Sequence, residues 1–154
     1  MTITRTKFKH FYDNIVINYR GDVAQDITSN VDTPLEFEVE TDDEWSLVDN
    51  SSNFVFTAPF DCVIDVYIDS FWETETYGLG SAVEFRHSIN GSIVSDYTQI
   101  QAPQDGSASL QMVAKTNVKL KLSKGDTYQP NIFHGVGANR EITEKTLSMV
   151  VNRA

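Results

Sequence analysis

The sequence predicts an all-β protein, an antiparallel jelly-roll β-sandwich of about 8–10 strands with an extended N-terminal arm. Apolar and polar residues alternate along several segments, turn signals separate these segments, and no amphipathic helix of about ten or more residues is evident. A chain of 154 residues has the size of one globular domain. We therefore expect an arm over residues 1–20 and one jelly-roll domain over residues 21–154.

Alternation with a period of two identifies the main strands. Residues 35–40, 62–72, 83–89 and 110–122 each place apolar side chains on one parity and mostly polar ones on the other, and residues 147–151 supply a last strand. Such segments bury one face and present the other to water. In 62–72 the residues expected to share the buried face are Cys62, Ile64, Val66, Ile68 and Trp72.

Two turn signals connect these strands. Asn90-Gly91 lies between residues 83–89 and 92–97, and this dipeptide favours a type I′ hairpin because both of its central positions need positive φ. Ser123-Lys124-Gly125-Asp126 closes the long strand onto residues 127–134. Residues 73–81 and 102–108 are expected loops, and Asn14–Asn18 is a candidate edge strand.

Charge is strongly segregated along a chain whose formal net charge is −10. Residues 1–20 carry four basic residues and one acidic residue, whereas residues 21–75 carry fifteen acidic residues and no Lys or Arg. The acidic body disfavours nucleic-acid binding, and the basic arm is suited to an acidic surface on a neighbouring subunit or another protein. A loose arm beside solvated acidic strand faces is the alternative. The arm residues proposed for attachment are Arg5, Lys7, Phe8, Lys9, Phe11, Tyr12 and Arg20.

Membrane and secretion signals are not evident. No apolar stretch approaches the roughly 20 residues that span a bilayer, and the first ten residues contain no apolar core typical of a secretory signal. The single cysteine, Cys62, permits no intrachain disulfide and is expected to be a small core residue. We expect neither membrane nor nucleic acid as a partner.

No residue pattern indicates an enzyme, a metal site or a cofactor. His10, His87 and His134 lack the spacing of metal-binding histidines, and no G-x-S-x-G motif holds a nucleophilic serine. Asp42-Asp43-Glu44, or Asp61, Asp65 and Asp69, offer oxygens for calcium, although solvated or arm-pairing carboxylates are the favoured interpretation.

Three aromatic residues flank loops: Trp45, Trp72 and Tyr77. Core packing is favoured for Trp72. The loop Tyr77-Gly78-Leu79-Gly80 is the candidate recognition segment.

Two motifs resemble a known family. Phe56-Thr57-Ala58-Pro59-Phe60-Asp61-Cys62-Val63-Ile64-Asp65-Val66 and, further on, Leu120-Lys121-Leu122-Ser123-Lys124-Gly125-Asp126-Thr127-Tyr128 are similar to the tumour necrosis factor and complement globular-head jelly roll over about residues 35–152. In that family the first motif leads into the central strand, and the second is the turn that closes a long strand. Short bacteriophage virion proteins of this fold are the most similar group, since they also have no secretion signal.

The resemblance implies a homotrimer about a three-fold axis, with Tyr128, Phe133, Met149 and Val151 as interface candidates. It also implies a non-enzymatic virion structural protein, assembled in the host cytoplasm, that decorates or cements a phage capsid. Its partner would be the major capsid protein or another virion protein. The alternative is a receptor- or glycan-binding module of a phage tail or fibre. A secreted cytokine-like ligand is a third class, disfavoured by the sequence start.

Overall fold

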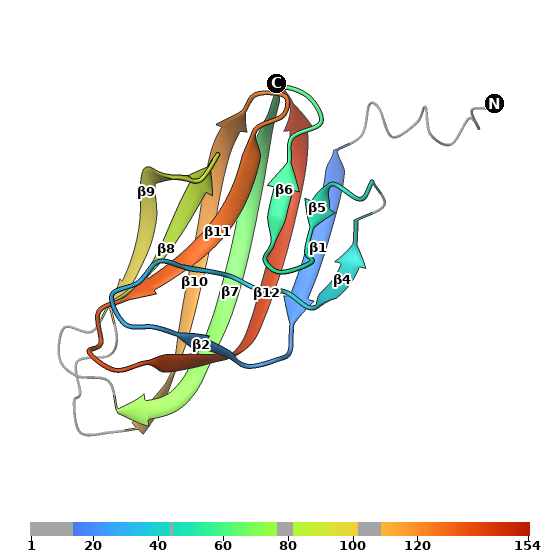
Figure 1. The fold of residues 1–154 in the computed structure, drawn as a ribbon. Helices are drawn as coiled ribbons and strands as arrows, with labels where there is room; N and C mark the ends of the chain where they lie inside the picture. The colour runs from blue at the N-terminus through green and yellow to red at the C-terminus, as the bar shows by residue number, and fades with distance from the viewer. Residues whose placement is uncertain (1–13, 44, 77–81, 102–108) are drawn as a thin grey trace.

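The computed structural model describes residues 14–43, 45–76, 82–101 and 109–154. All regular elements within these residues are β-strands, which form two antiparallel sheets (Figure 1). The predicted all-β antiparallel sandwich is therefore confirmed. The strands are β1 (Ile15–Gly21), β2 (Gln25–Ile27), β3 (Thr33–Pro34), β4 (Val39–Asp42), β5 (Val48–Asp49), β6 (Val55–Thr57), β7 (Cys62–Thr76), β8 (Ala82–Ile89), β9 (Ser92–Gln101), β10 (Ser109–Leu122), β11 (Thr127–His134) and β12 (Arg140–Arg153).

The two sheets are built from strands that are distant in the chain. Sheet A has the order β10-β7-β12-β1-β4, with β2 also paired to β12. Sheet B has the order β5-β6-β11-β8-β9, with β3 also paired to β11. The last strand, β12, lies between β7 and β1, so the two ends of the described chain meet inside one sheet. Repeated crossing between two stacked sheets is the connectivity of a jelly roll.

Strand β7 is the most extensively paired strand of sheet A. It pairs with β10 from Cys62 to Thr76 and with β12 from Cys62 to Trp72. The five residues that alternation assigned to its inner face, Cys62, Ile64, Val66, Ile68 and Trp72, are all fully buried. The indole of Trp72 donates a hydrogen bond to Ser70 Oγ at 3.0 Å, which satisfies its polar group inside the core.

The long strand β10 follows the same pattern. Met112, Ala114, Thr116, Leu120 and Leu122 are buried on one parity, and Val118 on that parity is half-buried. The alternation predicted for residues 110–122 is thus confirmed wherever side chains are described. The strand is an edge of sheet A, because β7 is its only hydrogen-bonded neighbour among the described strands.

Residues 35–40 differ from the prediction in their backbone. Leu35 and Phe37 are buried and Glu36 and Glu38 are exposed, as alternation predicted, but the paired strand β4 begins only at Val39. The reason is that this segment passes from β3 in sheet B to β4 in sheet A. Its backbone groups bond outside a ladder, with Leu35 N donating to Pro130 O and Phe54 N donating to Leu35 O.

The first described strand belongs to the sandwich. Strand β1 pairs with β12 along its whole length, from Ile15 opposite Val151 to Gly21 opposite Lys145, and with β4 on its other side. Residues 15–20 are therefore part of the jelly roll and not of a separate arm, and Asn14–Asn18 is not an edge strand. The remaining arm, residues 1–13, lies outside the described residues and stays a prediction.

The two predicted turns are linked by hydrogen bonds. Asn90 and Gly91 have φ values of 52° and 76°, as a type I′ hairpin between β8 and β9 requires. Asn90 Nδ2 donates to Asp126 Oδ1 at 2.8 Å, and Thr127 N donates to Asn90 Oδ1 at 2.9 Å. Asp126 also accepts from Ser123 N at 2.8 Å. These bonds hold the pKa of Asp126 below its ordinary value and join the two turns at one end of sheet B.

A lysine is buried inside the sandwich. Lys145 on β12 is fully buried, and its Nζ donates to Val23 O at 3.1 Å and lies 3.7 Å from Glu38 Oε1. The other oxygen of Glu38 accepts from Asp22 N and Val23 N, at 3.0 and 3.3 Å. Burial lowers the pKa of Lys145, and the nearby carboxylates oppose that shift. This Lys145–Glu38 clasp fastens the bend after β1 to the last strand.

The clasp requires a glycine at position 21. A Cβ built at Gly21 would lie 2.7 Å from Lys145 Cε and 2.9 Å from Nζ. We expect Gly21→Ala to lower the free energy of unfolding by about 1–3 kcal/mol, because the lysine must move from its buried partners. Urea unfolding measures this loss.

The matched control for this variant is Gly135→Ala. A Cβ at Gly135 meets only Asn30 Oδ1, at an ordinary 3.6 Å. We expect this variant to unfold near the wild-type midpoint. Equal stability of the two variants would contradict the role given to the close approach at Gly21.

Candidate functional site

The outward side of sheet A carries most of the large apolar side chains that the described strands expose. Because inward residues of β7 have even numbers, its odd-numbered residues point away from the core. Tyr67 on β7, Val16 on β1 and Val113 on β10 are 49%, 41% and 38% exposed. Phe71 and Val150 on the same side are half-buried. We call this side of β10, β7, β12 and β1 the outer face.

The strand register places Tyr67 at the centre of the outer face. It lies opposite Asn117 of β10 on one side and Ser148 of β12 on the other, and Ser148 in turn lies opposite Asn18 of β1. Facing residues in neighbouring antiparallel strands have Cβ atoms about 4.5–5.5 Å apart, so these four side chains form one uncharged row across the sheet.

Two ion pairs flank this row. Lys119 Nζ lies 3.3 Å from Asp65 Oδ2, and Lys115 Nζ lies 3.1 Å from Asp69 Oδ2. Both pairs join β10 to β7, two residues before and two residues after Tyr67. All four side chains are partly exposed, so each pair contributes little stability. Their effect is to neutralise the carboxylates beside the exposed ring.

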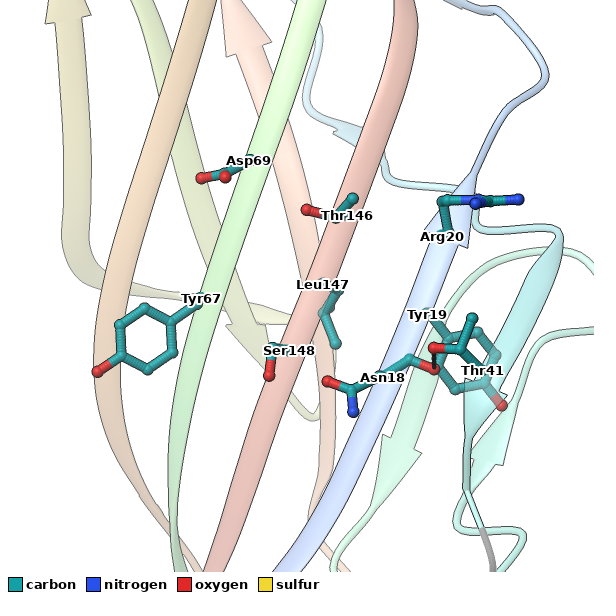
Figure 2. Close-up of a pocket in the computed structure, with 9 residues that line it drawn as sticks. All are labelled: Asn18, Tyr19, Arg20, Thr41, Tyr67, Asp69, Thr146, Leu147 and Ser148. Carbon is teal, nitrogen blue, oxygen red and sulfur yellow. Dashed lines mark hydrogen bonds between the residues drawn. The ribbon is translucent and has the colours of Figure 1, made fainter.

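A shallow groove of about 380 Å³ runs across β7, β12 and β1 (Figure 2). Figure 2 shows Tyr67 at one side, Ser148 and Asn18 in the middle, and Thr41 at the β4 side. Arg20 at its rim is paired with Asp22 at 2.7 Å. The groove therefore offers an aromatic ring, hydroxyls and an amide. The residues that line it are Asn18, Tyr19, Arg20, Thr41, Tyr67, Asp69, Thr146, Leu147 and Ser148.

This arrangement is suited to docking. A surface with exposed apolar groups, a central tyrosine and hydrogen-bonding side chains resembles the core of a protein–protein contact. Within the described part of the chain, no group of three or more His, Cys, Asp or Glu residues is placed to hold a metal ion. No helix among those residues has the length and apolarity needed to cross a bilayer.

Three of the four predicted interface residues lie inside the sandwich. Tyr128, Met149 and Val151 are buried in the core of a single chain, so their side chains have no surface for a neighbouring copy. Their assignment to a subunit interface is corrected accordingly. Phe133 is half-buried, and the Arg86 guanidinium lies 3.8 Å from its ring centre, held by Asp32 and Glu84.

The other predicted site residues are distributed as follows. Arg20 lies on β1 with its side chain exposed, as part of the sandwich. The remaining arm residues, Arg5, Lys7, Phe8, Lys9, Phe11 and Tyr12, and the predicted recognition loop, Tyr77, Gly78, Leu79 and Gly80, lie outside the described residues.

The buried histidines serve the core. His87 Nδ1 lies 2.9 Å from Tyr128 Oη, and the two rings are stacked with centres 5.9 Å apart. His134 Nε2 lies 2.9 Å from Ile27 O, and its ring packs edge-on against Trp72. The predictions of a core role for His87 and Trp72 are confirmed. Cys62 is also buried, as predicted, and burial raises the pKa of its thiol.

The acidic residues considered for calcium have protein partners. Asp65 and Asp69 pair with lysines, and Asp61 accepts from Lys124 N at 2.8 Å. Asp43 is buried and accepts from Leu47 N and Val48 N, each at 3.1 Å. Its carboxylate thus closes the turn that leads from β4 to β5.

Sequence reasoning missed the outer face. Its signal was present, because the alternation of 62–72 placed Tyr67 on the same parity as Asp65 and Asp69. An aromatic ring between two acidic residues on the solvent side of a strand is a candidate contact residue.

Comparison with known proteins identifies the type of jelly roll. No family model matches the chain, and no curated protein matches it by sequence. The globular domain of zebrafish complement 1qA protein superposes with a TM-score of 0.64 at 15% identity, covering 90% of this chain and 96% of that one. Eiger TNF from S. frugiperda superposes with a TM-score of 0.58 at 9% identity, covering 92% of this chain and 93% of that one. The fold is therefore a jelly roll like those of the complement and tumour necrosis factor globular domains.

The buried tyrosines make the fold sensitive to alkali. Burial raises the pKa of Tyr128, and burial with the Asp43 and Glu40 carboxylates raises that of Tyr19. A phenol in the unfolded chain ionises near pH 10, so the unfolded state loses its proton first. We expect stability to be retained below about pH 10 and lost above it, by up to about 1.4 kcal/mol per pH unit for each group.

Tyr128→Phe tests this expectation. The variant loses the hydrogen bond to His87, which costs about 1 kcal/mol at neutral pH, but it should show a shallower decline of stability between about pH 10 and 11. Urea unfolding at several pH values measures both effects. An unchanged pH slope in the variant would exclude Tyr128 as a source of the alkaline sensitivity.

Proposed function

We propose that the chain is a non-enzymatic module that assembles as a homotrimer through the outer face of sheet A. The observation that carries the proposal is the exposed row centred on Tyr67, with Val16 and Val113 on the same face. Contiguous exposed apolar groups on one side of a small protein mark an interaction surface. The fold of the complement and tumour necrosis factor type supports a trimer, as the resemblance of the two sequence motifs implied.

The outer face has the dimensions of a stable contact. Four strands about 4.8 Å apart, with about 14 residues rising about 3.3 Å each, give a surface of roughly 900 Å². A standard protein interface buries about 800 Å² per partner. The face is thus large enough for specific association without contributions from the loops.

The proposal of a non-catalytic role rests on where the reactive groups lie. His87, His134 and Cys62 are buried and are used in packing or hydrogen bonding. The groove of Figure 2 holds hydroxyls and an amide but no histidine or cysteine among its lining residues. This composition favours recognition over nucleophilic or acid–base chemistry.

Sedimentation equilibrium tests the assembly. We expect a species of about 52 kDa, three times the 17.3 kDa of one chain. Tyr67→Glu places a charge at the centre of the proposed contact and should shift the protein to monomer, because an unpaired buried charge is strongly unfavourable.

Ile93→Glu is the matched control. Ile93 on β9 is 46% exposed, similar to Tyr67, but lies in sheet B. This variant should keep the mass of the wild type. A monomeric wild-type protein, or equal behaviour of the two variants, would reject the outer face as the trimer contact.

We further propose that the trimer is a virion structural protein that decorates or cements a phage capsid. Its partner would be the major capsid protein or another virion protein. The resemblance of the sequence motifs to short phage jelly rolls and the basic character of residues 1–13 support this role. The acidic body would remain solvated while the basic segment makes the attachment.

Deletion of residues 1–13 tests the attachment. Since this deletion leaves β1 intact, we expect a folded trimer that no longer occupies capsids in a co-sedimentation assay. A second variant, with Arg5, Lys7 and Lys9 all changed to Gln, should weaken attachment and make it less sensitive to salt. Undiminished occupancy by the deletion variant would reject the anchor.

The alternative is a receptor- or glycan-binding module of a phage tail or fibre. The observation that favours it is the exposed Tyr67 ring beside the side chains of Asn18 and Ser148, since sugars stack on aromatic rings and bond to amides and hydroxyls. The two uses of this face exclude each other in one assembly. A monomer that binds a glycan array through Tyr67 would favour the alternative over the trimer.

A further inference from the structure

The two edges of sheet A carry opposite charge. Strand β10, at one edge, has Lys115, Lys119 and Lys121 and no acidic residue. Strand β4, at the other edge, has Glu40 and Asp42 and no basic residue, and the chain leading into it adds Glu36 and Glu38. The four strand spacings between these edges amount to about 19 Å. Sheet A therefore has a basic edge and an acidic edge.

Contacts within the chain leave one charge available at each edge. Lys115 and Lys119 are paired with carboxylates of β7. Lys121 is exposed and lies opposite Val63, which lies opposite Asn152, so its row across the sheet holds no carboxylate. At the acidic edge, Glu40 accepts from Tyr19 Oη.

Asp42 is the corresponding residue at the acidic edge. It lies opposite Asn18, in the row of Tyr67. Among the described residues, neither Lys121 nor Asp42 forms an ion pair within the chain.

This polarity selects the symmetry of assembly. A two-fold contact between sheet edges brings like edges together, either lysines against lysines or carboxylates against carboxylates. A head-to-tail contact brings the β10 edge of one copy toward the β4 edge of the next. Complementary potentials favour the second arrangement and like-charge contact disfavours the first.

We infer that copies of this chain associate head to tail, with the Lys121 edge of one copy against the Asp42 edge of the next. The inference rests on the proposed self-association and specifies its geometry. Head-to-tail contacts either close into a ring or continue as a filament. Each added copy brings a net charge of −10, which opposes indefinite growth and favours a small closed ring.

Cysteine cross-linking distinguishes the two symmetries. Lys121→Cys and Asp42→Cys each add one exposed thiol, while the native Cys62 is buried. Sedimentation equilibrium first establishes the assembly state of each variant, and a flexible bismaleimide then joins neighbouring thiols. We expect neither variant alone to cross-link and an equal mixture to give dimers that contain one chain of each. The double variant K121C/D42C should give covalent trimers of about 52 kDa.

The control pairs Lys121→Cys with Asp49→Cys, an exposed position on β5 of sheet B, and should not cross-link. Cross-linking of either single-edge variant with itself would overturn the head-to-tail geometry. A trimer that shows no cross-link in the double variant would also overturn it. A monomer by sedimentation, before the reagent is added, would instead reject the proposed self-association.

Discussion

Burial of one side of β7 is the constraint on which the rest of the structure depends. Its even-numbered residues, from Cys62 to Trp72, fill the space between the sheets, so every odd-numbered residue must face outward. The same parity extends through hydrogen-bonded register to β10 and β12. Tyr67 is therefore exposed because Val66 and Ile68 are buried, and a shift of one residue in register would exchange the core with the outer face.

Local alternation was sufficient to predict the sandwich, its long strands and the Asn90-Gly91 hairpin, because these depend on residues close in sequence. It could not locate the interface. Tyr128, Met149 and Val151 are apolar and share a parity with other apolar residues, but their pattern cannot say whether another sheet or another subunit covers them. Their own sheet partner covers them here. Of the candidate site, alternation indicated only that Tyr67 points outward.

Lys145 shows a second limit of sequence patterns. A lysine in a strand suggests the solvent side, yet the residues after it, Leu147 and Met149, share its parity and its burial. A register shift between Ile142 and Glu144 moves the inward positions from even to odd numbers just before Lys145. The burial is stable only because Glu38 and the Val23 carbonyl lie above Gly21, and none of these long-range contacts is apparent from spacing.

The pairing of β1 with β12 places the beginning and the end of the sandwich side by side. Ile15 lies opposite Val151, so Asn14 and Asn152 leave sheet A at the same end of neighbouring strands. The sandwich is therefore a natural candidate for circular permutation: a short linker could join the two ends, and new termini could be opened in a surface loop. For fusions, the same geometry means that a domain attached through either end would be displayed from one end of the sandwich, leaving the opposite end uncovered.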